Sequence, residues 1–377
     1  MKGYFRKRGN SWSFTIDVGR DPETGKRKQK TQSGFKTKKE AQSACASLID
    51  KINKGYSFDN HNVTVGQFID HWLEHVAKRK VTERTLLNYT RALDRRIRPY
   101  IGTLKLTELK LHHGQKLVTE FLEEGKSERY IEYTFTLFRG SLNFAVKTDI
   151  LQKNPLEHLE LPRPRQTKKT TWSAEEIKRF MIFSKTENPY YMVPLLIAAR
   201  TGMRRGEVLG LRWDKVDFER KKITVEYSLT FNEPTKQFIM VSPKTKSSYR
   251  QISIDDDLTN ELKRHRKRQL EMKMLLGADY DDSWNLVCCS TNGRPMYGRS
   301  LAHHFDHVAK KAGLKKIRIH DLRHSHATML LREGVNPKIV SERLGHSSIK
   351  MTLDVYSHVT LDMQEKTADI IKNILNF

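Results

Sequence analysis

Cysteine is scarce in this sequence of 377 residues, which holds only Cys45, Cys288 and Cys289. Two of the three are adjacent and the third is distant, a spacing that suits neither a disulfide framework nor a cysteine zinc site. We therefore expect reduced thiols that are buried or half-buried. Long apolar runs are missing as well, so no segment is predicted to span a membrane.

Acidic residues are outnumbered in the chain. It has 69 Lys and Arg against 44 Asp and Glu, a formal net charge of +25 and a pI near 9.8. This balance favours a polyanionic partner, with nucleic acid foremost. A membrane-surface protein would share the charge, but it would also show a basic helix with bulky apolar residues opposite, and none is visible.

Two further absences bear on location and on the source of energy. The first ten residues, MKGYFRKRGN, have no apolar stretch behind their charges, so the protein is expected to stay in the cytoplasm. The sequence has no phosphate-binding loop of the form GxxxxGK(S/T), which argues against ATP use. No cofactor is expected.

The length predicts more than one domain, since domains usually hold on the order of 100 to 200 residues. The stretch LPRPRQTKK at 161–169 has little to bury and marks the best boundary. We predict a multidomain α+β protein in four parts: a three-stranded β-sheet plus helix (1–58), an all-α bundle (62–160), a linker (161–171) and a mixed, mainly α domain with a β-sheet or hairpin (172–377).

The first module is predicted from the alternation of apolar and polar residues over 12–18 (WSFTIDV), which is typical of one strand. The segment DPETG at 21–25 offers turn chemistry, and an apolar pattern of helical spacing after Thr37 is expected to cover the sheet. Three lysines share a face of the returning strand: Lys26, Lys28 and Lys30. The hairpin is therefore expected to present a basic ribbon to DNA rather than to be a solubilising tail.

The second module is predicted to be entirely helical. Apolar residues at helical spacing begin behind an N-cap at Thr64, and a helix over about 82–98 is expected to end at Pro99. Three arginines lie on sides of that helix other than the apolar one: Arg84, Arg91 and Arg95. They suit contacts with DNA phosphates, although an ordinary solvated face fits them nearly as well.

The last domain contains four short segments that are weak singly and specific together. They are TGMRRGE at 201–207, PKTK at 243–246, HDLRH at 320–324 and LGH at 344–346, with Tyr356 ten residues after the last. Phosphoryl transfer at a DNA backbone needs cations for the non-bridging oxygens, an acid for the leaving sugar oxygen and a nucleophile. The set supplies each without a metal.

Local spacing supports this interpretation. His320 and Arg323 are three residues apart, so on a helix they face the same way, and Arg323 can grip two phosphate oxygens through its planar fork. Tyr356 has an ordinary pKa near 10 and becomes a good nucleophile only beside cations or a base. Zinc is an alternative for the histidines at 320, 324 and 326, but no second ligand pair has zinc-motif spacing, and no metal is expected.

In this order the four segments resemble the tyrosine recombinase (lambda integrase-like) family, and the layout of a basic β module, a helical module and a catalytic domain is similar to integrases of phages and integrative conjugative elements. The resemblance implies a site-specific recombinase that cuts and rejoins DNA through a 3′-phosphotyrosyl intermediate, integrating or excising a mobile element in a bacterial cell. It implies a homotetramer on double-stranded attachment sites, with accessory DNA-bending and directionality proteins as further partners.

Carried over residue by residue, the resemblance implies five catalytic positions besides a lysine: Arg204, His320, Arg323, His346 and the nucleophile Tyr356. It also implies that Lys244, on a β-hairpin, protonates the departing 5′ oxygen. Lys246 would point to the same side of a strand and stays an alternative. Arg205 directly follows Arg204 and leaves a second choice for the first arginine.

Two rival functions remain open. A type IB topoisomerase shares the chemistry, but the separate basic module favours a recombinase, since a second DNA-binding specificity helps to bridge distant sites. A catalytically silent DNA-binding regulator would lack the nucleophile or an arginine, whereas all six positions are filled. Apolar residues at helical spacing over 361–377 are expected to dock on a neighbouring protomer.

Overall fold

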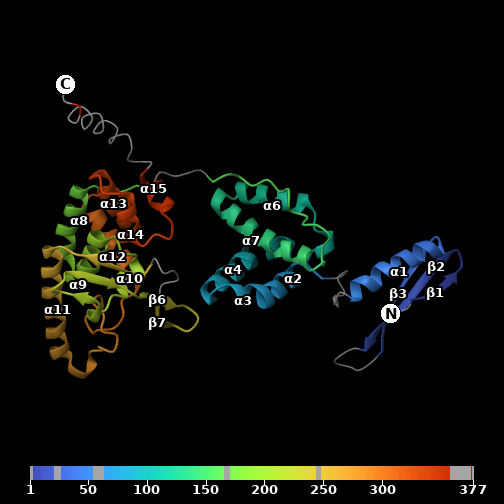
Figure 1. The fold of residues 1–377 in the computed structure, drawn as a ribbon, viewed down its shortest axis with the longest axis horizontal. Helices are drawn as coiled ribbons and strands as arrows, with labels where there is room; N and C mark the ends of the chain where they lie inside the picture. Colours follow the sequence, from blue (N-terminus) through green and yellow to red (C-terminus); the bar gives the residue numbers. More distant parts are fainter. Residues whose placement is uncertain are drawn as a thin grey trace. The chain divides into compact units, whose positions relative to one another are not determined.

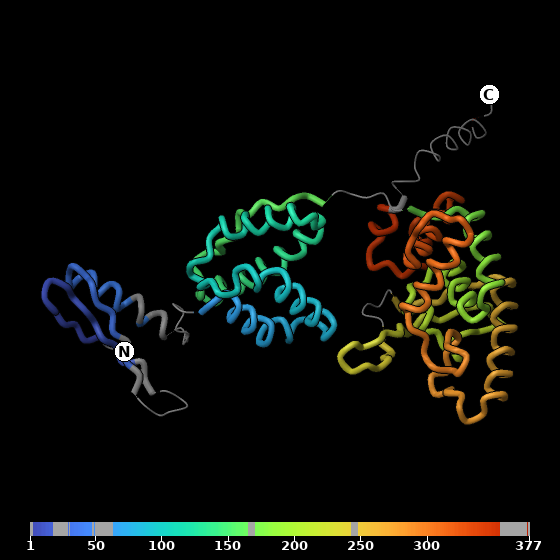
Figure 2. The backbone as a smooth tube through the Cα atoms, turned by 180° about the vertical axis from the view of Figure 1, so that it is seen from behind, coloured from blue at the N-terminus to red at the C-terminus, as the bar shows by residue number. Residues whose placement is uncertain are grey.

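The computed structural model describes residues 3–20, 27–53, 63–164, 170–242, 248–356 and 375. The chain divides into two compact units, Met1–Gln166 (unit 1) and Thr167–Phe377 (unit 2). Figures 1 and 2 show the elements of each unit from opposite sides. Small sheets and helical bundles alternate along the chain, which confirms the predicted multidomain α+β class. Among the described helices, none combines the length and apolar character needed to cross a membrane.

Unit 1 opens with an antiparallel sheet in the order β1–β2–β3, covered on one face by helix α1 (Figure 1). The bounds are β1 (Gly3–Arg8), β2 (Ser11–Arg20), β3 (Arg27–Phe35) and α1 (Lys38–Asn53). Phe14 and Ile16 of β2 are fully buried and pack with Ala41 and Cys45 of α1. The alternation seen in the sequence therefore places Phe14 and Ile16 in the core, and the predicted sheet plus helix is confirmed.

A helical bundle follows in unit 1. Its elements are α2 (Val65–Trp72), η1 (Leu73–Ala77), α3 (Lys78–Lys80), α4 (Glu83–Arg96), α5 (Arg98–Ile101), η2 (Leu106–Glu108), α6 (Leu111–Glu123) and α7 (Glu128–Lys147). Phe68, Phe121, Phe135 and Phe138 fill its core. The helix predicted to run over about 82–98 and to end at Pro99 is shorter, because α4 ends at Arg96. Pro99 lies in the first turn of the next helix, α5, where its missing N–H is harmless.

Unit 2 is built around α9, which packs against α8, α10, α11, α12 and α13. This helix is apolar on all sides, as its sequence PYYMVPLLIAART requires for a central position. The helices of unit 2 are α8 (Ala174–Glu187), α9 (Pro189–Thr201), α10 (Arg205–Leu209), η3 (Trp213–Lys215), α11 (Asp256–Leu276), η5 (Gly277–Asp279), α12 (Gly298–Lys311), α13 (Ile319–Arg332), α14 (Pro337–Leu344) and α15 (Lys350–Tyr356).

The strands of unit 2 form two small sheets. They are β4 (Val216–Asp217), β5 (Lys222–Val225), β6 (Ser228–Asn232), β7 (Gln237–Val241) and β8 (Arg250–Ser253). One sheet has the order β4–β5–β8, and the hairpin β6–β7, inserted between β5 and β8, stands out from the rest of the unit (Figure 2). The stretch 223–230 is divided between two strands, because β5 and β6 belong to different sheets.

Candidate catalytic centre

The turn after α9 carries the first predicted arginine. Gly202 ends α9 in the left-handed conformation at φ 68°, and a Cβ on it would lie 2.4 Å from Leu344 Cδ2 and 2.9 Å from His326 Cδ2. Only glycine suits both the backbone angle and this close approach. Arg204 then occupies the N-cap position of α10, where its backbone N–H donates to Glu207 Oε2 at 2.9 Å, so its position is fixed by two helix ends.

Arg323, on α13, reaches the same turn. Its Nη1 donates to Gly202 O at 2.9 Å, and the residue is only 4% exposed. Its Nη2 is buried and has no hydrogen-bond partner among the described residues. Burial, followed by the charge of Arg204, lowers the pKa of Arg323 to about 9. The result is a desolvated cation with an unused donor, the condition in which binding an anion gains most.

Arg204 is held by one carboxylate and one carbonyl. Its Nη1 donates to Glu207 Oε1 at 2.7 Å and its Nη2 to Gly345 O at 3.1 Å. The other oxygen of Glu207 accepts from Arg250 Nη2 at 3.0 Å, and both of these side chains are 6% exposed. Burial alone would raise the pKa of Glu207, but the charge and hydrogen bond of Arg250 hold it below its ordinary value.

Sequence reasoning missed the roles of Glu207 and Arg250. Glu207 lay inside the 201–207 segment, and an acidic residue three positions after a helix N-cap was a usable signal. Arg250 offered no signal, because it lies in a strand far along the chain and meets Glu207 only through the fold.

The predicted histidines lie at the same centre. The rings of His320 and His324 meet edge to face, with centroids 5.3 Å apart. Although part of His320 faces solvent, desolvation of its ring lowers its pKa, and the charge of Arg323 lowers it further. His346 follows the left-handed Gly345, and its Nδ1 lies 2.8 Å from Thr352 Oγ1. Burial, then Arg323 and Arg204, lower the pKa of His346 to about 4.

Tyr356 is the last residue of α15, a helix that packs against α13 and α14. The fold therefore brings its helix to the two elements that bear His320, Arg323 and the turn leading to His346. Lys244 and Lys246 lie outside the described residues, between β7 and β8, as does the predicted docking segment 361–377 apart from the exposed Leu375.

The zinc alternative fails at His326. Both nitrogens of its ring are engaged, Nδ1 with Ala199 O at 2.9 Å and Nε2 with Arg343 Nε at 3.3 Å. The residue is 6% exposed, so it is not available to share a metal with His320 or His324.

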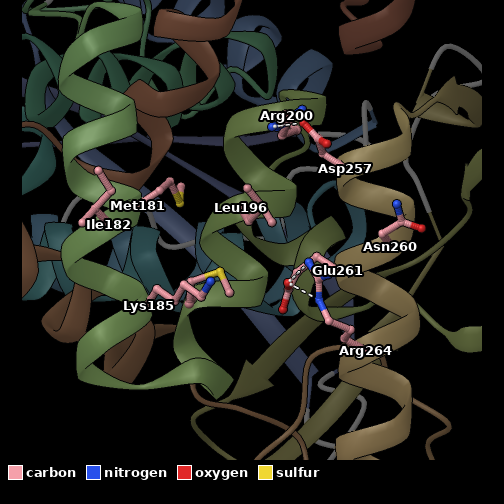
Figure 3. A pocket seen from close by; sticks show the side chains of 10 residues that line it. Met181, Ile182, Lys185, Leu196, Arg200, Asp257, Asn260, Glu261 and Arg264 are labelled. Atoms are coloured by element: carbon pink, nitrogen blue, oxygen red, sulfur yellow. Dashed lines mark hydrogen bonds and ion pairs between the residues drawn. The ribbon is translucent and has the colours of Figure 1, made fainter.

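A groove of ≈ 370 Å³ elsewhere in unit 2 offers a useful contrast (Figure 3). It lies between α8, α9 and α11 and contains none of the predicted site residues. Glu261 there binds two arginines, Arg264 at 2.6 Å and Arg268 at 2.8 Å, as Glu207 does at the candidate centre. The side chains of these two arginines are 64% and 34% exposed, so the arginines remain solvated, while the Glu261 side chain is 10% exposed.

The DNA-contact candidates of α4 share one exposed face. Arg84, Arg91 and Arg95 are exposed and are spaced by seven and four residues, which places them on one side of the helix. Arg98, just beyond α4, is instead paired with Asp70 at 2.6 Å and with Asp94 at 2.9 Å.

The lysines predicted in the first module differ in position. Lys26 lies outside the described residues. The register of β2 and β3 pairs Lys30 with Ile16 and Lys28 with Gly19. Residues that face each other across an antiparallel pair share a face of the sheet, so Lys30 lies at a position on the α1-covered face. The opposite face displays Tyr4, Arg6 and Arg8 of β1, which are exposed and were missed.

Known proteins resemble the chain along most of its length. Sequence profiles match an Arm DNA-binding domain at residues 4–52, a Phage integrase, N-terminal SAM-like domain at 64–122, and the Phage integrase family at 171–363. A "Tyrosine recombinase XerC-like" protein of Caldanaerobacter subterraneus subsp. tengcongensis is 29% identical over 98% of both chains. The "ICEBs1 integrase" of Bacillus subtilis is 29% identical over 98% of this chain and 99% of its own.

Solved structures share the fold. An integrase of transposon Tn1549 in complex with circular intermediate DNA covers 81% of this chain and 99% of its own, at 23% identity and a TM-score of 0.69. A lambda integrase tetramer bound to a Holliday junction covers 94% of each chain, at 17% identity and a TM-score of 0.58. The Phage integrase profile spans more than half of the chain and falls on the unit that holds the arginine pair. The chain belongs to the phage integrase family of tyrosine recombinases and is a site-specific DNA recombinase that cleaves and rejoins DNA.

Proposed function

We propose that Tyr356 is the nucleophile of strand cleavage. Its Oη forms a bond to the scissile phosphorus, the bond from phosphorus to the 5′ oxygen breaks, and a 3′-phosphotyrosine remains on the protein. Lys244 supplies the proton that the departing 5′ oxygen takes up. The freed 5′ hydroxyl of one duplex then attacks the phosphotyrosine of another, which rejoins the strands in the recombined order.

The arginine pair at the turn after α9 carries this proposal. Arg323 donates to Gly202 O and Arg204 to Gly345 O, so carbonyls of two neighbouring turns hold both guanidinium groups. The unpartnered Nη2 of Arg323 is a donor prepared for a non-bridging phosphate oxygen. Donors fixed before the reaction stabilise charge that grows in the transition state without reorganising.

His320 and His346 complete the proposed centre. The lowered pKa of each ring keeps it neutral at neutral pH, so each has one N–H to donate and one nitrogen to accept with. His346 shares a hydrogen bond with Thr352 of α15, the helix that ends at Tyr356. We propose that this contact orients His346 toward the phosphate and that His320 accepts or returns the tyrosyl proton.

Unit 1 is proposed to supply two DNA-binding modules, at 1–58 and 62–160, separated from the catalytic part at 172–377 by a linker at 161–171. The exposed stripe Arg84, Arg91 and Arg95 suits the phosphate backbone of the core site. In the first module, the uncovered sheet face with Arg6 and Arg8 is a better candidate for a second, arm-type site than the position of Lys30.

Assembly and biological role follow from the same proposal. Exchange between two duplexes needs four cleavages, so we propose a homotetramer on double-stranded attachment sites, with the segment 361–377 joining protomers. Accessory DNA-bending and directionality proteins are further expected partners. The element moved is proposed to be a phage or an integrative conjugative element. The separate basic module argues against a swivelling topoisomerase.

A trapping experiment tests the proposal. Wild type and Tyr356→Phe are mixed with a randomised library of nicked duplexes that release the cleaved strand, and protein-bound DNA is sequenced after detergent denaturation. Adducts with wild type alone, sharing a core sequence, are expected. Adducts of equal yield with Tyr356→Phe would contradict the assigned nucleophile.

A further inference from the structure

One guanidinium group joins the last turn of α14 to the last turn of α9. Arg343 donates from Nη2 to Arg200 O at 3.2 Å, and from Nη1 to Ser253 O, at the end of β8, at 3.1 Å. Its Nε donates to His326 Nε2 at 3.3 Å. Three nitrogens of one planar group thus meet acceptors from α9, β8 and α13, an arrangement that the flexible point charge of a lysine cannot reproduce.

His326 is restricted to one tautomer by these contacts. Arginine can only donate, so His326 Nε2 accepts, and Nδ1 carries the hydrogen that it donates to Ala199 O at 2.9 Å. Burial, followed by the charge of Arg343, lowers the pKa of His326 to about 4, so the ring stays neutral at neutral pH. The ring therefore orients Arg343 while it satisfies a carbonyl at the end of α9.

Both turns joined by Arg343 lead directly into the candidate centre. From Arg200 the chain passes through Gly202 to Arg204. From Arg343 it passes to Gly345, whose carbonyl accepts from Arg204 at 3.1 Å, and then to His346. The spacing of the two turns therefore sets where Arg204 finds its acceptor.

The backbone of Arg343 is tied to the same network. Its carbonyl accepts from Arg250 Nε at 2.7 Å, and Arg250 Nη2 donates to Glu207, the carboxylate that binds Arg204. Movement of this turn would thus be transmitted to Arg204 by two routes, one through Gly345 and one through Arg250 and Glu207.

We propose that Arg343, oriented by His326, is a positioning residue for strand cleavage that fixes the turn bearing His346 against the turn bearing Arg204. The inference rests on the proposed function of Arg204 and Tyr356. All three nitrogens of the Arg343 guanidinium group already donate to protein acceptors, so it acts through geometry and not through contact with the phosphate. A misplacement of about 1 Å at a catalytic group costs on the order of 10²-fold in rate.

The test compares two nicked duplexes of the core sequence recovered by trapping, one with the natural scissile phosphate and one with an uncharged methylphosphonate in its place. Single-turnover formation of the covalent complex is measured for full-length wild type, Arg343→Met, Arg343→Lys and His326→Leu. Arg204→Ala and Tyr356→Phe serve as references. Arg264→Met is the control, since Arg264 lies in the groove of Figure 3 and its hydrogen-bond partner among the described residues is Glu261.

On the natural phosphate, Arg343→Met is expected to cleave about 10²-fold more slowly, with DNA affinity within about threefold of wild type. Arg343→Lys should be nearly as slow, and His326→Leu should lose about tenfold, since it frees one of three donors. On the methylphosphonate, Arg204→Ala and Arg343→Met should both recover toward wild type, because no phosphate charge remains for Arg204 to neutralise.

Two results would overturn the inference. An unchanged rate for Arg343→Met means that the turns are held without it. An equal deficit on both duplexes means that the residue only supports folding. If Tyr356→Phe also forms covalent complexes, the proposed function itself fails, an outcome separable from the other two because it needs no Arg343 variant.

Discussion

Arginines serve different purposes in two regions of this molecule. In unit 2, Arg323 is 4% exposed, is bonded to Gly202 O and has its pKa lowered to about 9 by burial. On α4 of unit 1, Arg91 and Arg95 are exposed and form no ion pair with the described residues. A buried cation acts on one phosphate in a site with little water, whereas an exposed cation binds by releasing counterions. The buried arginine should therefore govern the rate of cleavage, and the exposed arginines the affinity for DNA.

The largest effect on cleavage is expected at the buried Arg323. Replacing it by Met should slow cleavage by about 10³-fold, because a preorganised donor to the phosphate is lost. The free energy of unfolding should change by less than about 1 kcal/mol, since relief from burying a charge offsets the lost bond to Gly202 O. Single-turnover cleavage and calorimetric unfolding measure the two effects.

Arg91→Ala is the control for that experiment. Its cleavage rate at saturating DNA should match wild type. A similar loss of rate in both variants would mean that burial does not separate the two groups of arginines.

Glu207 and Glu261 sharpen the comparison within unit 2, because each binds two arginines. Glu207→Gln should cost about 3 kcal/mol of unfolding free energy, since Arg250 is left buried without its charged partner, and should slow cleavage by about 10²-fold. Glu261→Gln, whose arginines are solvated, should cost under about 1 kcal/mol and leave cleavage unchanged. Denaturant unfolding and cleavage rates provide the measurement. Equal effects of the two variants would contradict the claim that the burial of the arginine partners makes Glu207 the more important carboxylate.

The exposed stripe of α4 should affect affinity alone. Arg91→Ala combined with Arg95→Ala should weaken DNA binding by about tenfold and make the slope of log K against log salt shallower by about 0.9 per residue. Arg98→Ala is the matched control, because Arg98 is already paired with Asp70 and Asp94. Binding titrations at several salt concentrations measure the slopes. A slope unchanged in the double variant would show that α4 does not face the phosphates.

The smallest effect at neutral pH concerns buried histidines. Burial lowers the pKa of His265 and of His326 to about 4, below the ordinary value of 6.5. Between pH 6.5 and 4 these histidines are protonated in the unfolded chain but stay neutral in the folded protein. The unfolding free energy should therefore fall as the pH falls, by up to about 1.4 kcal/mol per pH unit for each ring. Above pH 6.5 the contribution of these two rings to the unfolding free energy should be independent of pH. Calorimetry of wild type and His326→Gln should show a shallower fall in the variant, and parallel curves would contradict the assignment.

The sequence was sufficient for periodic and local features. Alternation over 12–18 predicted the strand that the structure shows as β2. The sequence also led to Arg204, Arg323 and His346, which the fold brings together where the turns after α9 and α14 meet α13. It could not give Arg250 or Arg343, whose partners are carbonyls and carboxylates distant along the chain.

The register of the strands could not be predicted from the sequence either. A slip or bulge changes the face on which a residue lies, and β2 and β3 shift register between Asp17 and Gly19. The shared face assigned to Lys28 and Lys30 therefore did not reveal that Lys30 pairs with Ile16, nor that Arg6 and Arg8 occupy the uncovered face. The separation of β5 from β6 has a similar origin, because a short run of strand-forming residues does not show which partner each half takes.

Mapping the covalent adduct identifies the residue that attacks the DNA. Wild-type protein trapped on its nicked core duplex is digested with protease and nuclease, and the modified peptide is sequenced by mass spectrometry. We expect a nucleotide joined through its 3′ phosphate to Tyr356. A nucleotide on any other residue, or a linkage through a 5′ phosphate, would contradict it.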